Sequence, residues 1–333
     1  MENEKLGKAI AYLRKKAGYT QQQLAGLLDI SDKAVSKWER GLSCPDISLL
    51  AKLSVLLDTD IESLLEGNVS YHKHMWKGML FLGNNISEIS ICTQIYDKPM
   101  VYYFLSYFLL VGIREILIIC SPKEKERTER IIGNGRQFGV QIFYCVNNRD
   151  GDINSWLINK KAFFENYNVM VVYGKRFLYG LDLTKYFQRA MARQHGITVF
   201  VTQNQCVKDA KRDLWREHCP IPVLFLGVDI LNKMFNEKDI DVSIEDFVSK
   251  DEEVYVELAG RGMLEFSLVD EEDIVDASML VRAIQRQQGE CIACLEEIAW
   301  RRGLISKKEL SCLAEKEEGT MYGRYIRRLC EEK

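Results

Sequence analysis

Hydrophobic residues follow two different patterns along the chain. Up to Gly67, apolar residues recur every three or four positions, as they do on the buried side of short helices. From Lys77 onward, short apolar runs that are typical of buried strands alternate with helical stretches. The two patterns predict two domains, residues 1–67 and 77–333, joined by a linker over 68–76.

The first pattern predicts an all-α domain of five short helices. Thr20 can cap a helix over 21–28, because Gln23 completes a capping box. Ser31 can cap the next helix, over 32–40. Only a tight turn separates these two helices, which is the spacing of a helix-turn-helix.

The sequence YTQQQLAGLLDISDKAVSKWERGLSCPDISLLAKLSVLLD, residues 19–58, resembles the phage-repressor/Cro-like helix-turn-helix family. The resemblance covers residues 3–67 and implies that the second helix of the pair enters the major groove of double-stranded DNA. It places the residues that contact bases or phosphates at Gln21, Asp32, Lys33, Ser36, Lys37 and Arg40.

The overall charge of this domain does not by itself favour nucleic acid. Residues 1–67 contain nine lysines and arginines against ten acidic residues, a net charge of −1. A helical bundle used for protein contacts is therefore the alternative. Lys33, Lys37 and Arg40 nevertheless fall on one side of the predicted second helix, and a local basic patch is sufficient for DNA binding. We therefore expect double-stranded DNA as a partner.

The second pattern predicts an α/β domain. Apolar runs that predict strands cover residues 77–82, 114–122, 141–146, 168–174 and 197–203, and a longer run over 101–113 predicts a helix. Strands that alternate with helices in this way are typical of a Rossmann-like, mostly parallel sheet with helices on both faces. In such sheets, ligands bind at the carboxyl ends of the strands.

Four segments of the second domain carry a resemblance to a known enzyme family. They are YDKPMVYYFLSYFLLVGIREILIICSP (96–122), RFLYGLDL (176–183), GRG (260–262) and RQQGECIACLEEIAWRRGLI (286–305). These segments resemble glucose-1-phosphate thymidylyltransferases. The resemblance implies a sugar nucleotidyltransferase-like fold and the chemistry that joins glucose-1-phosphate to deoxythymidine triphosphate.

The chain departs from the pattern of this family where magnesium and phosphate should bind. The family's two metal-binding aspartates fall on Lys175 and Ser267. Its glycine-rich phosphate loop has no counterpart after residue 82, and its sugar-phosphate loop is missing between Asp209 and Pro222. Nucleotidyl transfer depends on a metal that neutralises the triphosphate. These departures predict a pseudoenzyme with no catalytic residues, and an active transferase fused to a DNA-binding domain is the alternative.

The resemblance also implies a regulatory pocket, remote from the active site, that binds the end product of the pathway at a subunit interface. Its ligand-binding positions fall on Tyr103, Leu110, Gly180, Arg261, Glu297, Ile298 and Arg301. One neighbouring position, Thr184, departs from the histidine of the family. Arginines suit a diphosphate because the guanidinium group binds anionic oxygens with two hydrogen bonds. We therefore expect a thymidine-diphosphate (dTDP) sugar as effector, dTDP-rhamnose in particular; the alternative is that these residues only maintain the interface.

Composition and charge exclude some classes of protein but do not indicate a function. The net charge of −3 excludes a polycation, and Arg114 and Glu115 interrupt the longest apolar stretch, so we expect no membrane span. Ten cysteines without a secretory signal pattern indicate a reduced, cytoplasmic protein. Cys291 and Cys294 could form half of a zinc site, but no second ligand pair accompanies them, and we expect neither metal nor cofactor.

Together these features predict a sequence-specific transcriptional regulator whose nucleotidyltransferase-like domain senses a nucleotide sugar. The family is oligomeric, so the resemblance implies a homo-oligomer, either a dimer or a tetramer. A DNA-binding scaffold whose large domain only oligomerises is a further alternative.

Overall fold

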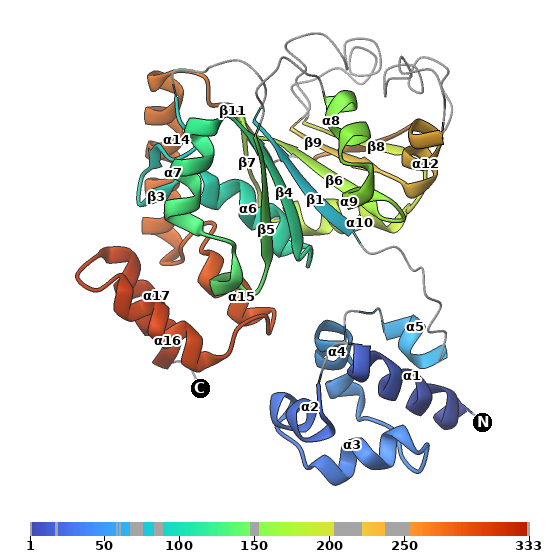
Figure 1. Cartoon of the computed structure of the whole chain (residues 1–333). Coiled ribbons are helices and arrows are strands. Elements are labelled where there is room, and N and C mark those ends of the chain that lie inside the picture. The colour runs from blue at the N-terminus through green and yellow to red at the C-terminus, as the bar shows by residue number, and fades with distance from the viewer. Residues whose placement is uncertain are drawn as a thin grey trace. The chain divides into compact units, whose positions relative to one another are not determined.

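The computed structural model describes residues 2–16, 19–57, 59, 61–66, 76–82, 89–146, 153–202, 222–236, 254–260 and 262–331. The chain divides into two compact units, residues 1–73 together with 302–304, and residues 74–301 together with 305–333 (Figure 1). Most of the predicted linker lies outside the described residues, so the domain boundaries stay predictions. None of the described helices combines the length and the apolar character that a membrane crossing requires.

The first unit is a bundle of five helices. They are α1 (Glu2–Lys16), α2 (Gln21–Leu28), α3 (Asp32–Glu39), α4 (Ile47–Leu56) and α5 (Ile61–Glu66). The predicted capping box is present at Thr20 and Gln23, and the Ser31 side chain accepts a hydrogen bond from the amide of Ala34. Helix α3 ends one residue earlier than predicted, because Arg40 is its C-cap.

A glycine allows α1 and α3 to pack closely. Gly7 is buried, and a Cβ atom there would lie 2.1 Å from the carbonyl oxygen of Trp38 and 3.1 Å from that of Glu39. Both contacts are with backbone, which cannot move aside as a flexible side chain can. The close approach brings the end of α3 against α1, where Val35 and Trp38 join the buried core.

We expect Gly7→Ala to destabilise the first unit by on the order of 2 kcal/mol, because the added methyl group overpacks a backbone contact. Gly26→Ala is a matched control within α2, where the new Cβ atom would meet nothing within 4 Å. This control should stabilise the unit by about 0.5–1 kcal/mol, because alanine loses less conformational entropy in a helix. Hydrogen exchange of the α1 and α3 amides in the full-length protein measures both effects.

The second unit contains a central sheet, two small two-stranded sheets and the helices around them. Its strands are β1 (Trp76–Phe81), β2 (Gln94–Ile95), β3 (Lys98–Pro99), β4 (Glu115–Cys120), β5 (Gln141–Val146), β6 (Asn168–Tyr173), β7 (Arg176–Tyr179), β8 (Ile197–Val201), β9 (Val223–Leu226), β10 (Val254–Leu258) and β11 (Leu264–Ser267). Its helices are α6 (Met100–Leu110), α7 (Pro122–Ile132), the short 3-10 turn η1 (Arg136–Phe138), α8 (Ile153–Asn159), α9 (Lys161–Phe164), α10 (Leu183–Ala192), α12 (Val228–Asn236), α14 (Glu271–Gln288), α15 (Leu295–Arg301), α16 (Lys307–Lys316) and α17 (Met321–Glu331).

The central sheet has seven strands in the order β10-β8-β9-β6-β1-β4-β5. All neighbouring strands run parallel except where β9 pairs with β6 and β8. The predicted α/β fold with a mostly parallel sheet is thus confirmed. The antiparallel strand β9 was not predicted, although its four residues form an apolar run after Pro222.

Alternate side chains of each strand point to opposite faces of this sheet, and helices cover both faces. Met79 and Val171 belong to the cluster that α8, α9 and α12 cover. Gly78 lies on the other face, where a Cβ atom would come within 2.7 Å of the Phe108 ring of α6. Phe187 of α10 also covers this face, packing edge-on against Phe200 of β8 and Phe225 of β9. The five inner strands are therefore buried on both sides, which explains their continuous hydrophobic runs, whereas the edge strands β5 and β10 are partly exposed.

Candidate functional site

The residues predicted to contact DNA lie on α3 and at the start of α2. Asp32, Lys33, Lys37 and Arg40 are exposed, and Ser36 is half-buried. The Arg40 guanidinium donates to the carbonyl oxygen of Ser36 at 3.2 Å, which holds its aliphatic stem along the helix. Lys33, Lys37 and Arg40 are one turn apart, so α3 presents three positive charges along one side.

Gln21 makes a contact that the sequence analysis did not anticipate. Its side-chain amide donates to Glu39 at 2.6 Å. Glu39 also accepts two hydrogen bonds from the Arg14 guanidinium, at 2.5 and 3.1 Å, and Arg14 donates a further one to the carbonyl oxygen of Tyr19. The carboxylate therefore ties α1, α2 and α3 together and fixes the angle between the two helices of the helix-turn-helix. Predicted as a phosphate ligand, Gln21 here positions α2 against α3.

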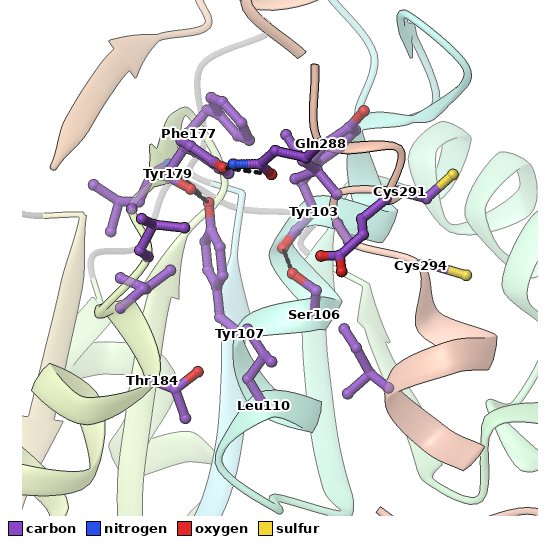
Figure 2. Close-up of a pocket in the computed structure, with 18 residues that line it drawn as sticks. Tyr103, Ser106, Tyr107, Leu110, Phe177, Tyr179, Thr184, Gln288, Cys291 and Cys294 are labelled. Carbon is purple, nitrogen blue, oxygen red and sulfur yellow. Dashed lines mark hydrogen bonds between the residues drawn. The ribbon is translucent and has the colours of Figure 1, made fainter. Parts of the chain in front are cut away.

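A cavity of about 290 Å³ opens in the second unit between α6, β7 and the segment that follows α14 (Figure 2). Four of the seven predicted effector-binding residues line it: Tyr103, Leu110, Gly180 and Ile298. Three separate stretches of sequence contribute them, so the fold brings these residues together. Thr184, where the family has a histidine, lines the same cavity.

The aromatic part of the lining was missed by the sequence analysis. Tyr107, Phe177, Tyr179 and Gln288 all face this cavity (Figure 2). The Tyr107 hydroxyl donates to the carbonyl oxygen of Leu178 and accepts from its amide, at 3.0 and 2.7 Å, which fixes β7 against α6. These positions carried no signal because apolar and aromatic residues at helical or strand spacing look like ordinary core.

Two further predicted effector residues, Glu297 and Arg301, do not line this cavity. Glu297 accepts hydrogen bonds from Arg301 at 2.7 Å and from the Tyr325 hydroxyl at 2.5 Å. Both Glu297 and Arg301 belong to α15, the helix that also carries Ile298. Arg261 lies outside the described residues. The described lining contains the acidic Glu290 but neither lysine nor arginine. Counter-charge for a diphosphate would thus have to come from the rim.

A buried polar cluster holds the segment over 290–294 in place beside the cavity. The Lys98 side chain is only 2% exposed; its ammonium lies 2.6 Å from Asp97 and 5.4 Å from the centre of the Tyr103 ring. Gln285 donates to Asp97 at 2.9 Å, and its amide oxygen accepts from the backbone of Ile292 at the same distance. The Tyr-Asp-Lys-Pro motif therefore acts as a structural link between α6, α14 and the segment that lines the cavity.

Each of the two cysteines of the CxxC motif lies beside a carboxyl group. Cys291 lies 4.0 Å from Asp97, and burial raises the pKa of its thiol to about 12. Cys294 lies 3.7 Å from Glu296, a buried side chain that also accepts from the hydroxyl of Tyr322. Burial raises the pKa of the Glu296 carboxyl, although the Tyr322 hydrogen bond lowers it in part. Among the described residues, no group of three or more potential ligands could hold a metal ion.

Lys175 and Ser267 lie together at the carboxyl edge of the central sheet. The amide of Leu268 donates to the carbonyl oxygen of Lys175 at 2.8 Å, and Ser267 pairs with Arg176 across β7 and β11. Burial lowers the pKa of the half-buried Lys175 ammonium. Glu265, which the sequence analysis did not single out, is the nearby carboxylate. It accepts from Arg176 at 2.9 Å and from Thr202 at 2.6 Å, so both of its oxygens are already engaged.

Magnesium would need carboxylate or other oxygen ligands at this edge. Lysine and serine do not fit the metal-binding role that the family gives to these two positions, so no catalytic step is assigned to a metal held by Lys175 and Ser267. The altered phosphate-loop segment is GNNISEISICTQ (83–94), of which residues 83–88 lie outside the described residues; the segment between Asp209 and Pro222 lies outside them entirely.

Comparison with known proteins matches both units. Residues 10–64 match the helix-turn-helix family, and residues 92–211 match the nucleotidyl transferase family. The glucose-1-phosphate thymidylyltransferase of Neisseria gonorrhoeae is 32% identical over 285 residues, which cover 75% of this chain and 98% of the relative. The same enzyme from Neisseria meningitidis is 31% identical and is covered over 99% of its length. The resemblance stated from the sequence is thereby confirmed for both units.

A solved structure supports the fold. The chain superimposes with a TM-score of 0.50 on a Bacillus anthracis protein, in complex with sucrose, that is assigned to the glucose-1-phosphate thymidylyltransferases. The superposition covers 62% of this chain and 95% of the other chain, at 17% identity. At that identity the likeness establishes the nucleotidyltransferase fold and not the ligand.

The prediction that the chain is not an enzyme is contradicted by these comparisons. Relatives at 25–32% identity that carry the thymidylyltransferase name align with most of the second unit. The prediction gave decisive weight to two substituted positions, Lys175 and Ser267, and to two loops that lie wholly or partly outside the described residues. An alignment that spans nearly the whole length of an enzyme outweighs such local departures, and the pseudoenzyme assignment was therefore wrong.

Proposed function

The chain belongs to the glucose-1-phosphate thymidylyltransferase family, and we propose that this member is also a sequence-specific DNA-binding regulator of transcription controlled by a nucleotide sugar. In this proposal the helix-turn-helix unit reads DNA. The family domain binds a dTDP-sugar, with dTDP-rhamnose the first candidate. Self-association then couples ligand binding to DNA binding.

The clustering of Tyr103, Leu110, Gly180 and Ile298 around one cavity carries the proposal for the effector. The resemblance selected these positions as a regulatory pocket without knowledge of the fold. Tyrosine and phenylalanine rings in the lining suit the stacking of a flat base or the apolar face of a sugar. Gly180 leaves room at this wall for the flexible end of the Met263 side chain, which a Cβ atom would approach within 2.7 Å.

The coupling requires two copies of the protein. Two recognition helices related by a two-fold axis would fit DNA half-sites about 34 Å apart, one turn of the double helix. A ligand that binds one arrangement of the subunits better than another changes that spacing and so the affinity for DNA. Such coupling typically amounts to about 1–3 kcal/mol.

We expect Lys37→Ala to weaken specific DNA binding by about 1–3 kcal/mol if the ammonium contacts a base. If it contacts a phosphate, the loss of affinity is the same for all DNA sequences, and the slope of log affinity against log salt concentration falls by about one. The measurement is affinity for a duplex selected from a random library, at several salt concentrations. Lys8→Ala is the matched control, because Lys8 is an exposed lysine of α1 that pairs with Glu4 and is not among the residues predicted to contact DNA. Failure to enrich any palindromic sequence would refute the DNA-binding part of the proposal.

Thymidylyl transfer is a second candidate function, favoured by the near-complete coverage of the Neisseria enzyme. The half-buried ammonium of Lys175 could provide counter-charge to phosphate oxygens at the carboxyl edge of the sheet. We therefore expect pyrophosphate release from deoxythymidine triphosphate and glucose-1-phosphate in the presence of Mg²⁺, and a loss of at least about tenfold in Lys175→Met, since one charge-assisted hydrogen bond is worth about 1.5–3 kcal/mol.

The control for this assay is Lys185→Met, which removes an exposed lysine that pairs with Asp182 on α10. Equal rates for both variants would exclude a role for Lys175. The complete absence of pyrophosphate release from repurified wild-type protein would exclude this second function without affecting the DNA-binding proposal.

A further inference from the structure

Helix α14 buries one side against its own unit and leaves the opposite side open. Ile274, Ala277 and Val281 are buried, and Ser278 accepts a hydrogen bond from the amide of Tyr96. Figure 1 shows α14 at the outer edge of the second unit. The open side is a single stripe at helical spacing, and its members are Glu272, Val275, Asp276, Met279, Arg282, Ala283 and Arg286.

The open stripe exposes two large apolar side chains between its charged residues. Met279, at its centre, is 64% exposed, and Val275, one turn earlier, is 50% exposed. Residues 272, 276, 279, 283 and 286 alternate steps of four and three, which is the spacing of a seam between two packed helices. Such a stripe fits a helix partner that is not part of the same unit.

The stripe is also self-complementary about Met279. Counting outward, Asp276 and Arg282 are each three residues from Met279, and Glu272 and Arg286 are each seven residues away. Val275 and Ala283 are likewise equidistant from it. If a second α14 runs antiparallel with Met279 opposite Met279, every acidic residue of the stripe faces an arginine. Every apolar residue faces an apolar one.

We propose that α14 pairs antiparallel with α14 of a second copy of this chain, around a two-fold axis at Met279. The pairs Asp276–Arg282 and Glu272–Arg286 would each occur twice, as a two-fold interface requires. This proposal deepens the proposed function, which rests on two copies associating, by assigning the surface through which they do so.

Favourable interaction with the helix dipole does not account for the whole stripe. Acidic residues in the first turn and arginine in the last turn stabilise any helix, and this explains Glu272 and Arg286. Asp276 and Arg282 lie in the middle of the helix, where the dipole has little effect. Among the described residues, neither has an ion-pair partner within its own chain. Pairing between copies supplies that partner and covers Met279.

The same helix leads directly into the cavity. Gln288, its last residue, lines the cavity, and so does Cys291 in the segment that follows. Gln285, on the inner side, anchors that segment through Ile292. A shift of one α14 against its partner would therefore reach the cavity wall through a single rigid element.

The test is a charge swap in the full-length protein, with molar mass measured by sedimentation equilibrium. Asp276→Arg and Arg282→Asp each place like charges opposite one another across the axis, and each should weaken association at least about tenfold. The double variant restores opposite charges in reversed order and should regain the wild-type mass. Glu315→Arg, an equivalent charge reversal on the exposed side of α16, is the control and should associate like wild type.

Each outcome decides the proposal. Wild-type mass in both single variants, or a double variant no better than the singles, would overturn the antiparallel pairing; so would a monomeric wild-type protein. Circular dichroism shows whether a variant is folded, and Met279→Lys provides a second disruption at the axis itself. If wild-type protein associates but the swaps have no effect, this interface is wrong while the regulator proposal stands. Loss of ligand or DNA binding alone would not affect the result.

Discussion

Replacing Arg14 with methionine is expected to destabilise the helix-turn-helix unit by about 3–5 kcal/mol, because Glu39 would be left as a buried charge without its partner. The Arg14 and Glu39 side chains are 9% and 8% exposed, and their closest atoms are 2.5 Å apart. A domain of this size has little stability to spare. We therefore expect Arg14→Met to remove DNA binding through loss of structure, although Arg14 is buried and not among the residues predicted to contact DNA.

The double variant Arg14→Met, Glu39→Met separates this account from a general loss of packing. Replacing both members of a buried ion pair by apolar residues is often close to neutral. The double variant should therefore be markedly more stable than the single one. Hydrogen exchange of the α1, α2 and α3 amides in the full-length protein measures both. Equal destabilisation by single and double variants would show that the interaction between the two charges contributes nothing.

Acid should weaken the same unit. Burial alone would raise the pKa of the Glu39 carboxyl, but hydrogen bonds from Arg14 and Gln21 lower it below its ordinary value. A carboxyl group with a lowered folded-state pKa contributes stability above its unfolded pKa and loses it as the pH falls through the folded value. Glu39→Gln should flatten this part of the pH dependence of amide protection in α1 and α3, since it cannot titrate.

Local sequence signals were sufficient to predict helices and strands whose ends and buried sides are specified by residues within or next to the element. The helix over 21–28 and the strand over 141–146 were predicted with the bounds that the structure gives. Thr20 and Gln23 specify the first through side-chain contacts within three residues. β9 was missed because its register depends on β6 and β8, strands that are distant in sequence and that no local pattern relates to it.

The residues of the candidate site likewise divide into those that the sequence identified and those whose position depends on tertiary packing. Tyr103, Leu110, Gly180 and Ile298 were found because the motifs that carry the resemblance contain them. The resemblance could not say that Glu297 and Arg301 would pair with each other beside the cavity instead of lining it. That arrangement depends on Tyr325 of α17, which approaches α15 only in the folded unit. The i, i+4 spacing of Glu297 and Arg301 permits their ion pair on a helix, but the contact with Tyr325 is decided by tertiary packing and leaves no trace in spacing.

A dTDP-sugar is expected to stabilise the folded protein by roughly 2.7 kcal/mol when its concentration is a hundred times the dissociation constant. A thermal-shift panel of nucleotide sugars, followed by calorimetry, measures this effect. Binding depends on a cation for the diphosphate, and the described cavity lining has none. The proposal assigns this role to Arg301, one turn beyond Ile298 on α15. The resemblance adds Arg261, which lies outside the described residues.

Arg301→Ala and Arg261→Ala should each abolish the response of DNA affinity to the dTDP-sugar while leaving DNA binding without ligand intact. Loss of a charge-assisted hydrogen bond to an anion typically costs about 1.5–3 kcal/mol, or at least about tenfold in ligand affinity. To bind the ligand, Arg301 must leave Glu297, so Glu297→Gln should strengthen binding of the diphosphate by freeing the guanidinium. This sign would be reversed if Glu297 itself held the sugar.

The matched control is Arg327→Ala. Arg327 is 53% exposed and pairs with Glu318 at 3.1 Å, much as the 54% exposed Arg301 pairs with Glu297 at 2.7 Å. It lies on α17 and not on the cavity rim, so its removal should leave the ligand response unchanged. If all three alanine variants respond like wild type, or if calorimetry detects no binding at millimolar dTDP-sugar, the cavity is not the effector site. DNA binding by α3 would then stand without a ligand to control it.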